Sequence, residues 1–239
     1  RDRGLVMISF SAIALGAAIG GCLPLISLWM ETFNISFQRI GIVCGISALG
    51  IVCSAYFAPR FATKYGFVLT INIGLIIAAI TSVAFRFTDN YALWLLLRFV
   101  CGLGLGLHWV LTEAWLASIV KENYRTRVMA IYAIAMSIGF AVGPIVIWLF
   151  GPLSVIPFLI IGSLLILSIL PIAKLKGHEP KSSKSHKASP LILIRKAPTV
   201  ASACIVVGSV DLALISLLPA MITRTPEAAP ILALSLIHI

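Results

Sequence analysis

Four side chains that could bind or move a charged group lie on one apolar segment, Ala92–Val120. They are Arg98, His108, Thr112 and Glu113. At about 100° per residue, all four fall within an arc of about 140° on the surface of a helix. Arg98 and Glu113 are about 22 Å apart along the helix axis, so they cannot pair with each other. The spacing therefore predicts a polar stripe whose charged members need partners from other elements.

The segment around this stripe is long enough to cross a membrane, because about 20 apolar residues span a hydrocarbon core of about 30 Å. A charge at the centre of such a helix costs about 2.5–3.5 kcal/mol and is usually retained for a use. For Arg98 that use is either binding or coupling, or a structural bond to another helix. Glu113 could likewise serve function or structure, because Lys121 and the cytoplasmic surface are only two turns away. His108 could take part in the pathway or be a neutral histidine that is hydrogen-bonded in the interior.

The composition is that of a membrane protein. Of the 239 residues, 60% are hydrophobic and 11% are charged, against about 45–50% and about 25% in soluble domains. The net charge of +10 sits in short connections between apolar runs, which excludes nucleic acid as the expected partner. The five cysteines lie within apolar runs without metal-ligand spacing. We therefore predict no metal site and no cofactor.

Apolar blocks of membrane-spanning length recur along the chain and predict an all-α helical bundle. A 46-residue uncharged run, Val128–Ala173, is long enough for two spans that fold back at Gly151-Pro152. An eighth helix should begin at Ala228 and be cut short by the last residues, of which 235–239 resemble translated adapter sequence. The other five spans are Gly4–Met30, Ile40–Pro59, Gly66–Phe85, Ala92–Val120 and Ala197–Thr223.

The distribution of Lys and Arg predicts the orientation and the boundaries of the two halves. With the N-terminus inside, fourteen basic residues lie on the inner side and three on the outer side, so the N-terminus should be cytoplasmic. The first span is read as a retained anchor because it is too long for a signal peptide. We expect a six-helix half at 1–173, a basic cytoplasmic loop at 174–196 and the start of a second half at 197–239.

Glycines four residues apart indicate close helix packing and a weak internal repeat. Gly16/Gly20 in the first span correspond to Gly102/Gly106 in the fourth. Gly41/Gly45 in the second span correspond to Gly139/Gly143 in the fifth. Pro144 follows directly and removes a backbone hydrogen bond, which would bend its helix.

Together these motifs resemble the major facilitator superfamily of secondary transporters, in an uncharacterised bacterial branch. Arg98 followed by Gly102 and Gly104 is similar to that family's fourth-helix motif, and Gly139 to Pro144 to its exporter motif. The resemblance implies a two-half bundle in a bacterial inner membrane, a monomer, and two helices, the fourth and the seventh, that line a central cavity.

The loop between the second and third spans also resembles the family's cytoplasmic gate. It keeps Lys64 and Gly66, but Thr63 stands where the family has Asp, and Phe67-Val68 replace a basic pair. The resemblance therefore does not extend to a charge relay in this loop.

The sequence thus favours a secondary active transporter of a small solute, working by alternating access, rather than an enzyme. Drug or metabolite efflux and sugar-like uptake stay open. Protons are the expected second partner, because Glu113 and Asp211 are the carboxylates at membrane depth. We also expect Arg98 and Asp211 to pair when the two halves close. The alternatives are a non-transporting receptor or assembly protein on the same fold, and an integral-membrane enzyme.

Overall fold

Every regular element in the described part of the chain is a helix. The computed structural model describes residues 2–120, 122–177, 179–180 and 197–223. Seven of its helical stretches are long and apolar enough to cross a membrane, with α6 and α7 together forming one of them. The elements are α1 (Asp2–Glu31), α2 (Phe37–Tyr65), α3 (Phe67–Ala84), the short 3₁₀ helix η1 (Phe85–Phe87), α4 (Tyr91–Ile119), α5 (Glu122–Phe150), α6 (Ile156–Leu167), α7 (Ile169–Ala173) and α9 (Pro198–Thr223).

The predicted all-α membrane bundle and its seven spans are confirmed. The fold-back at Gly151-Pro152 is also observed: α5 ends at Phe150, and Gly151 has a φ of 75°, which favours glycine because it lacks a Cβ. The start of α4 is fixed by Asn90, whose Oδ1 accepts hydrogen bonds from the amides of Ala92 and Leu93. The predicted eighth helix and most of the 174–196 loop lie outside the described residues.

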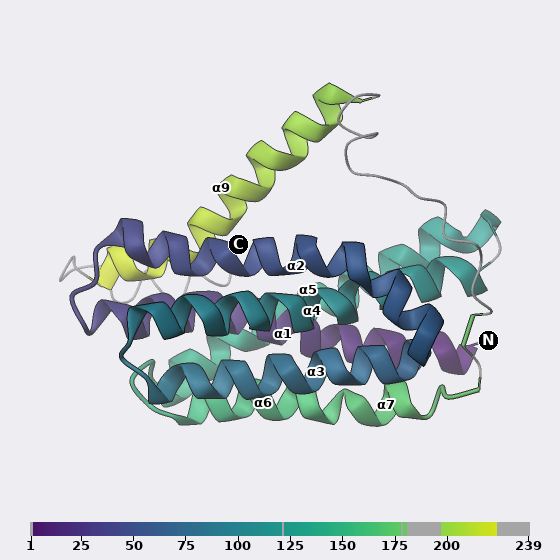
Figure 1. Ribbon diagram of the computed structural model, residues 1–239, viewed down its shortest axis with the longest axis horizontal. Helices are drawn as coiled ribbons and strands as arrows, with labels where there is room; N and C mark the ends of the chain where they lie inside the picture. Colours follow the sequence, from purple (N-terminus) through teal and green to yellow (C-terminus); the bar gives the residue numbers. More distant parts are fainter. Residues whose placement is uncertain (1, 121, 178, 181–196, 224–239) are drawn as a thin grey trace.

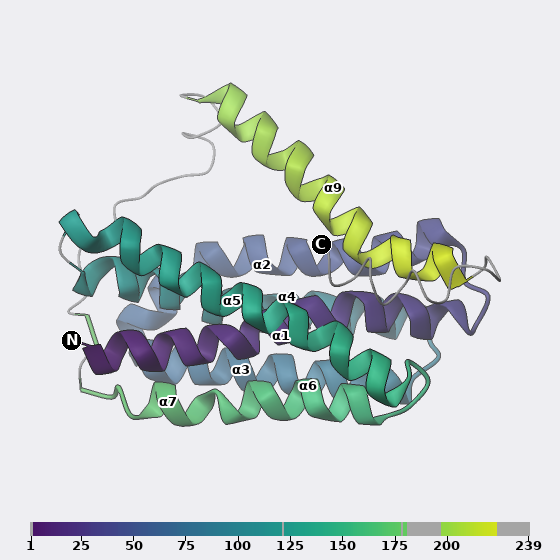
Figure 2. The ribbon, with the colours of Figure 1, turned by 180° about the vertical axis from the view of Figure 1, so that it is seen from behind.

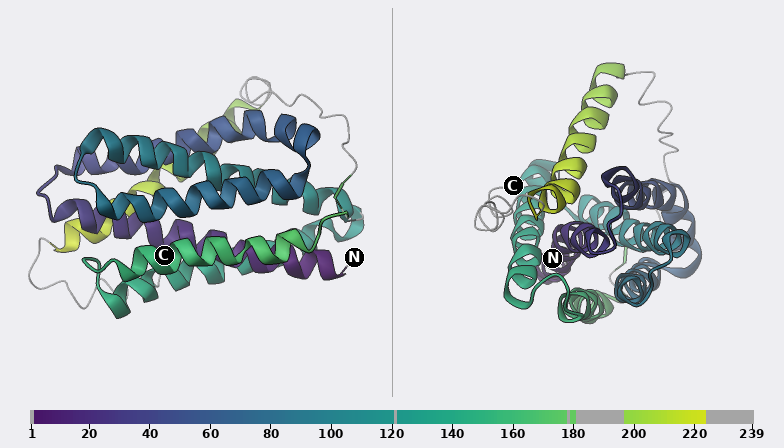
Figure 3. Two further views of the ribbon diagram at one scale, coloured as in Figure 1. Left: turned by 60° about the horizontal axis from the view of Figure 1, so that its bottom comes forward. Right: turned by 90° about the vertical axis from the view of Figure 1, so that its left-hand side faces the viewer.

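Two tightly packed helix pairs form the framework of the bundle, α1 with α5 and α2 with α4. Helix α3 packs on α4, while α6 and α7 run beside α1 and α3 (Figures 1, 2 and 3). If the first three spans correspond to the next three, the α1–α5 pair corresponds to the α4–α2 pair. The α3–α4 contact then corresponds to the contact of α6 with α1. The packing of the first three spans is thus repeated in the next three.

Glycines bring the paired helices close enough for their backbones to touch. A Cβ on Gly139 would collide with the carbonyl of Ile13 on α1, and one on Gly102 with the carbonyl of Ser47 on α2. The α2 glycine at that contact is Gly50. A Cβ added to Gly50 would lie 2.8 Å from the backbone nitrogen of Leu103 on α4. The sequence pattern placed this role elsewhere on α2, at Gly41/Gly45, but Gly45 faces open space.

Helix α9 is attached to the six-span bundle through its C-terminal half. It leaves the bundle at an angle (Figures 1 and 2) and contacts α1 and α2. Ser216 and Ala220 are buried in this contact, and Leu217 comes close to Gly41 of α2. The N-terminal half of α9 carries exposed apolar side chains, including Val206 and Val210.

Candidate functional site

Arg98 lies inside the bundle and not on its surface. Its side chain is 3% exposed, and Nη2 donates a hydrogen bond of 2.8 Å to Ser47 Oγ on α2. Nη1 lies 4.0 Å from Cys101 Sγ, one turn along α4. Nε is buried without a hydrogen-bond partner among the described residues. The structural alternative for Arg98, a bond to a neighbouring helix, is therefore present in this arrangement.

His108 connects α4 to α1. The ring is fully buried, and Nε2 lies 2.8 Å from Ser11 Oγ. Its Nδ1 has no partner among the described residues. The hydrogen-bonded histidine that the sequence allowed is thus what the structure shows, with one ring nitrogen still available.

Thr112 connects α4 to α5. Its hydroxyl lies 2.8 Å from the His108 carbonyl oxygen and 3.2 Å from the hydroxyl of Tyr132. Both Thr112 and Tyr132 are buried. Tyr132 was not predicted from the sequence, because a single tyrosine in an apolar run is also typical of ordinary packing.

Glu113 is half-buried and is hydrogen-bonded within its own helix. Its Oε1 accepts a bond of 2.7 Å from Trp109 Nε1, one turn earlier. Unlike the other three members of the stripe, Glu113 has no hydrogen bond to another helix in the described part of the chain. It is the stripe's most accessible titratable group.

The predicted polar stripe of α4 therefore connects to three helices at successive heights. Arg98 contacts α2, His108 contacts α1 and Thr112 contacts α5. Because side chains in a membrane interior cannot turn to water, each such bond fixes the position of α4 against a neighbour. The partners Ser47 and Ser11 were missed by sequence reasoning, since isolated serines in apolar spans carry no signal of their own.

A second buried contact joins α1, α3 and α4 near Arg98. Cys22 Sγ lies 3.6 Å from Ser82 Oγ, which in turn lies 3.5 Å from Cys101 Sγ. These cysteines are free thiols in the interior. In the described part of the chain no group of three or more His, Cys, Asp or Glu side chains could hold a metal ion.

The structure does not bring Asp211 to Arg98. Asp211 is an exposed residue in the middle of α9, whereas the Arg98 guanidinium is directed at Ser47 and Cys101. The predicted pair would require α9 to approach the bundle along more of its length.

The turn between α2 and α3 has a partner that sequence reasoning missed. Gly66 has a φ of 89°, and the amide of Phe67 donates a hydrogen bond of 2.7 Å to Glu179 Oε2. Lys64 lies over the ring of Tyr65, 5.0 Å from its centroid. Glu179 is the single acidic residue of the 174–196 loop, so a carboxylate from that loop caps the first turn of α3.

The remaining glycines of the two motifs lie at helix contacts. Gly104 faces Gly74 of α3, and Gly106 faces Ser54 of α2. Gly143 faces Gly21 of α1, and Pro144 is buried beside it within α5. These residues therefore hold helices together in the structure.

Comparison with known proteins agrees with the fold and the motifs. The family model of the Major Facilitator Superfamily matches residues 8–237, so the chain belongs to this superfamily. An uncharacterized MFS-type transporter of Yersinia pestis (strain Pestoides F) is 25% identical over 220 residues, covering 90% of this chain and 55% of the relative. The uncharacterized MFS-type transporter YfkF of Bacillus subtilis (strain 168) is 27% identical over 168 residues, covering 70% of this chain and 43% of the relative.

A solved structure shares the fold. The crystal structure of a bacterial homolog to the human lysosomal transporter Spinster, inward-facing and unoccupied, matches with a TM-score of 0.73 at 18% sequence identity. The match covers 99% of this chain and 58% of that one. The chain thus spans about half the length of the proteins it matches.

Proposed function

We propose that the whole protein is a secondary active transporter that moves a small solute across a bacterial inner membrane by alternating access. The observation that carries this proposal is the superfamily match over residues 8–237. The curated relatives described as MFS-type transporters support it, as does the fold shared with a transporter homolog. In such folds the solute site lies between two halves near the middle of the membrane.

The polar stripe of α4 is the best candidate for this chain's share of the solute and proton pathway. Ionisable side chains within membrane-spanning segments generally face a bundle interior or a water-filled cavity. Arg98, His108 and Thr112 are buried in the interior, and Glu113 is partly accessible. Glu113 and Asp211 are the carboxylates at membrane depth, so they are the proposed sites of proton uptake and release.

We further propose that Arg98 and Asp211 approach each other in one state of the transport cycle. Arg98 already has an unpartnered Nε among the described residues, and Asp211 is exposed on the helix that begins the second half. Closing the halves on one side would bring the charges together. A proton or a solute on Asp211 would release Arg98 to Ser47, the contact seen here.

The direct test is solute uptake by the full-length protein in proteoliposomes under an imposed pH gradient. A mixture of metabolites, with the internal content read by mass spectrometry, avoids choosing a substrate beforehand. We expect gradient-dependent uptake of one solute class, lost in Arg98→Gln and kept in Arg39→Gln, whose arginine is exposed at the end of the bundle. A folded full-length protein that takes up nothing would favour the receptor or assembly alternative instead.

The proposed pair has its own test in the same assay. Arg98→Ala and Asp211→Ala should each abolish coupled uptake, because truncating one partner leaves the other charge stranded. Exchanging the two residues should restore part of the activity. Normal uptake by both single variants would show that the pair does not form.

A further inference from the structure

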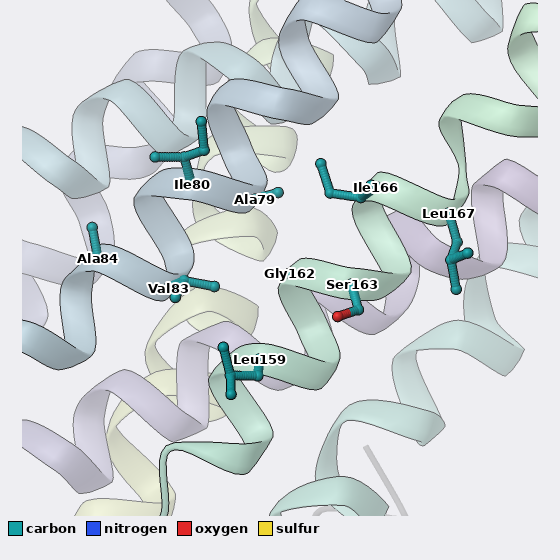
Figure 4. Close-up of a pocket in the computed structure, with 9 residues that line it drawn as sticks. All are labelled: Ala79, Ile80, Val83, Ala84, Leu159, Gly162, Ser163, Ile166 and Leu167. Carbon is teal, nitrogen blue, oxygen red and sulfur yellow. The ribbon is translucent and has the colours of Figure 1, made fainter.

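A groove of about 710 Å³ runs between α3 and α6 on the outer surface of the bundle (Figure 4). Its floor consists of the small buried residues Ala79 and Gly162. Larger exposed side chains form the rim, among them Ile80 at 61% exposure and Leu167 at 53%. The full lining is Ala79, Ile80, Val83, Ala84, Leu159, Gly162, Ser163, Ile166 and Leu167.

The small side chains are the reason that the groove exists. Figure 4 shows Ala79 pointing from α3 toward Ile166 on α6. At Gly162 the helices come so close that an added Cβ would lie 2.7 Å from Val83 Cγ2. Because Ala79 and Gly162 are small, the surface is hollow between the larger side chains that surround them.

The location of the groove limits what can occupy it. Both of its helices are membrane-spanning stretches, and the groove opens away from the core side of α3 and α6, which carries Leu75, Phe158 and Leu165. Its medium is therefore the hydrocarbon of the bilayer. The stretch from Leu159 to Leu167 is about 12 Å long. The hydrocarbon layer of a single leaflet has a similar thickness, about 15 Å. An acyl chain lying along the groove matches this length and this chemistry.

A fixed positive charge marks one end of the groove. Arg86 in η1 follows the last lining residues of α3, and its Nη2 donates a hydrogen bond of 3.2 Å to the Leu153 carbonyl, just before α6. The guanidinium also lies over the ring of Trp29, 3.8 Å from its centroid. Its buried Nε has no partner among the described residues. The cation is thus held where the headgroup of a lipid in that leaflet would lie.

We propose that this groove binds one phospholipid, with an acyl chain between α3 and α6 and its phosphate beside Arg86. An acyl chain alone gains little by leaving other lipid tails, because they are as apolar as the groove. The charge of Arg86 supplies the preference, since a guanidinium binds a phosphate strongly and with defined geometry. This site is independent of the proposed transport activity, and it is a surface site, not a solute pathway.

Native mass spectrometry of the purified full chain in mild detergent tests the acyl-chain half of this proposal. The probe is phosphatidylglycerol, compared with a diacylglycerol of the same chains, which lacks the phosphate. We expect the wild type to retain one phosphatidylglycerol several-fold better than the diacylglycerol. Ser163→Trp should fill the groove and lower retention several-fold, whereas Ile73→Trp, on an exposed α3 position outside the lining, should not. Equal retention by these two variants would overturn the site.

The phosphate half is tested by a second matched pair. Arg86→Gln should reduce phosphatidylglycerol retention to the level of the diacylglycerol. Arg39→Gln should leave retention unchanged, although Arg39 also lies over an aromatic ring, that of Tyr91. If Arg86→Gln and Arg39→Gln behave alike, the phosphate contact is wrong. Should Ser163→Trp fail to fold, Ala84→Leu fills the groove from its end and replaces it in the comparison.

Discussion

At the scale of single residues, hydrogen bonds to neighbouring helices hold α4 in place. The sequence predicted the α4 member of each of these bonds but not its partner. Arg98, His108 and Thr112 could be predicted because ionisable and polar side chains within a membrane span stand out. Their partners Ser47 and Ser11 could not, because serine is common in packed spans and contact between helices depends on how they are arranged in space. The contact of Arg98 with α2 therefore had to be found in the structure.

The Ser47 contact should be measurable as stability. Ser47→Ala leaves the Arg98 Nη2 donor unpaired in the interior, which costs about 1–3 kcal/mol. We expect a lower melting temperature in detergent than for Ser118→Ala, which removes only an intrahelical bond to the Trp115 carbonyl. Equal melting temperatures for the two variants would show that Ser47 does not hold Arg98.

Glu179 should protect the first turn of α3. Glu179→Ala removes the acceptor of the Phe67 amide, a change that costs about 0.5–2 kcal/mol at a helix N-terminus. Hydrogen exchange should speed up in the first turn of α3 and nowhere else in that helix. Glu122→Ala, at an exposed position in the first turn of α5, serves as the control and should leave α3 unchanged. Unaltered exchange in α3 after the Glu179 change would contradict the cap.

At the scale of elements, the spans and their fold-back at Gly151 could be predicted because length and apolarity alone decide them. Which faces touch could be predicted in part. The glycine pairs on α1, α4 and α5 lie at close contacts, but on α2 the contact is at Gly50 and not at Gly45. The spacing of the glycines could not predict which of the two contacts α4. Both lie in the same apolar helix, and the contact depends on how that helix is rotated against α4.

Glycine substitutions should separate contact faces from free faces. Gly139→Leu places a side chain against the carbonyl of Ile13, so the two backbones must move apart. Overpacking of this kind costs about 1–3 kcal/mol or more. A Cβ added at Gly45 meets nothing within 4 Å, so Gly45→Leu should be tolerated. Gel filtration after mild heating should show aggregation of the first variant only, and the reverse order would mean that the α1–α5 contact is misplaced.

At the scale of the whole molecule, the bias of basic residues predicts the orientation in the membrane. Single cysteines at Asn90 and Ser183 should be labelled from outside and inside, respectively, by a membrane-impermeant reagent. The background carries Cys53→Ser and Cys204→Ser, because these are the native thiols that are not buried. Ser183 lies outside the described residues. The opposite labelling pattern would reverse the orientation.

In the packing of the whole molecule, α9 is joined to the other spans over only part of its length. The α1–α5 and α2–α4 pairs form a six-span bundle together with α3 and α6–α7, while α9 contacts it with only its C-terminal half and leaves Asp211 exposed. Alternating access requires one half to move against the other. The sequence predicts a boundary between halves at the basic loop, most of which lies outside the described residues. It carries no signal for the attachment of α9, because that depends on which helix faces meet in space.

The most direct measurement compares solute uptake by the full-length protein with uptake by residues 1–239, both in proteoliposomes under the same pH gradient. Equal amounts of inserted protein, verified by protease protection, make the two samples comparable. We expect gradient-dependent uptake by the full-length protein and none by residues 1–239. Uptake by residues 1–239 at a rate similar to that of the full-length protein would contradict a transporter built from two halves.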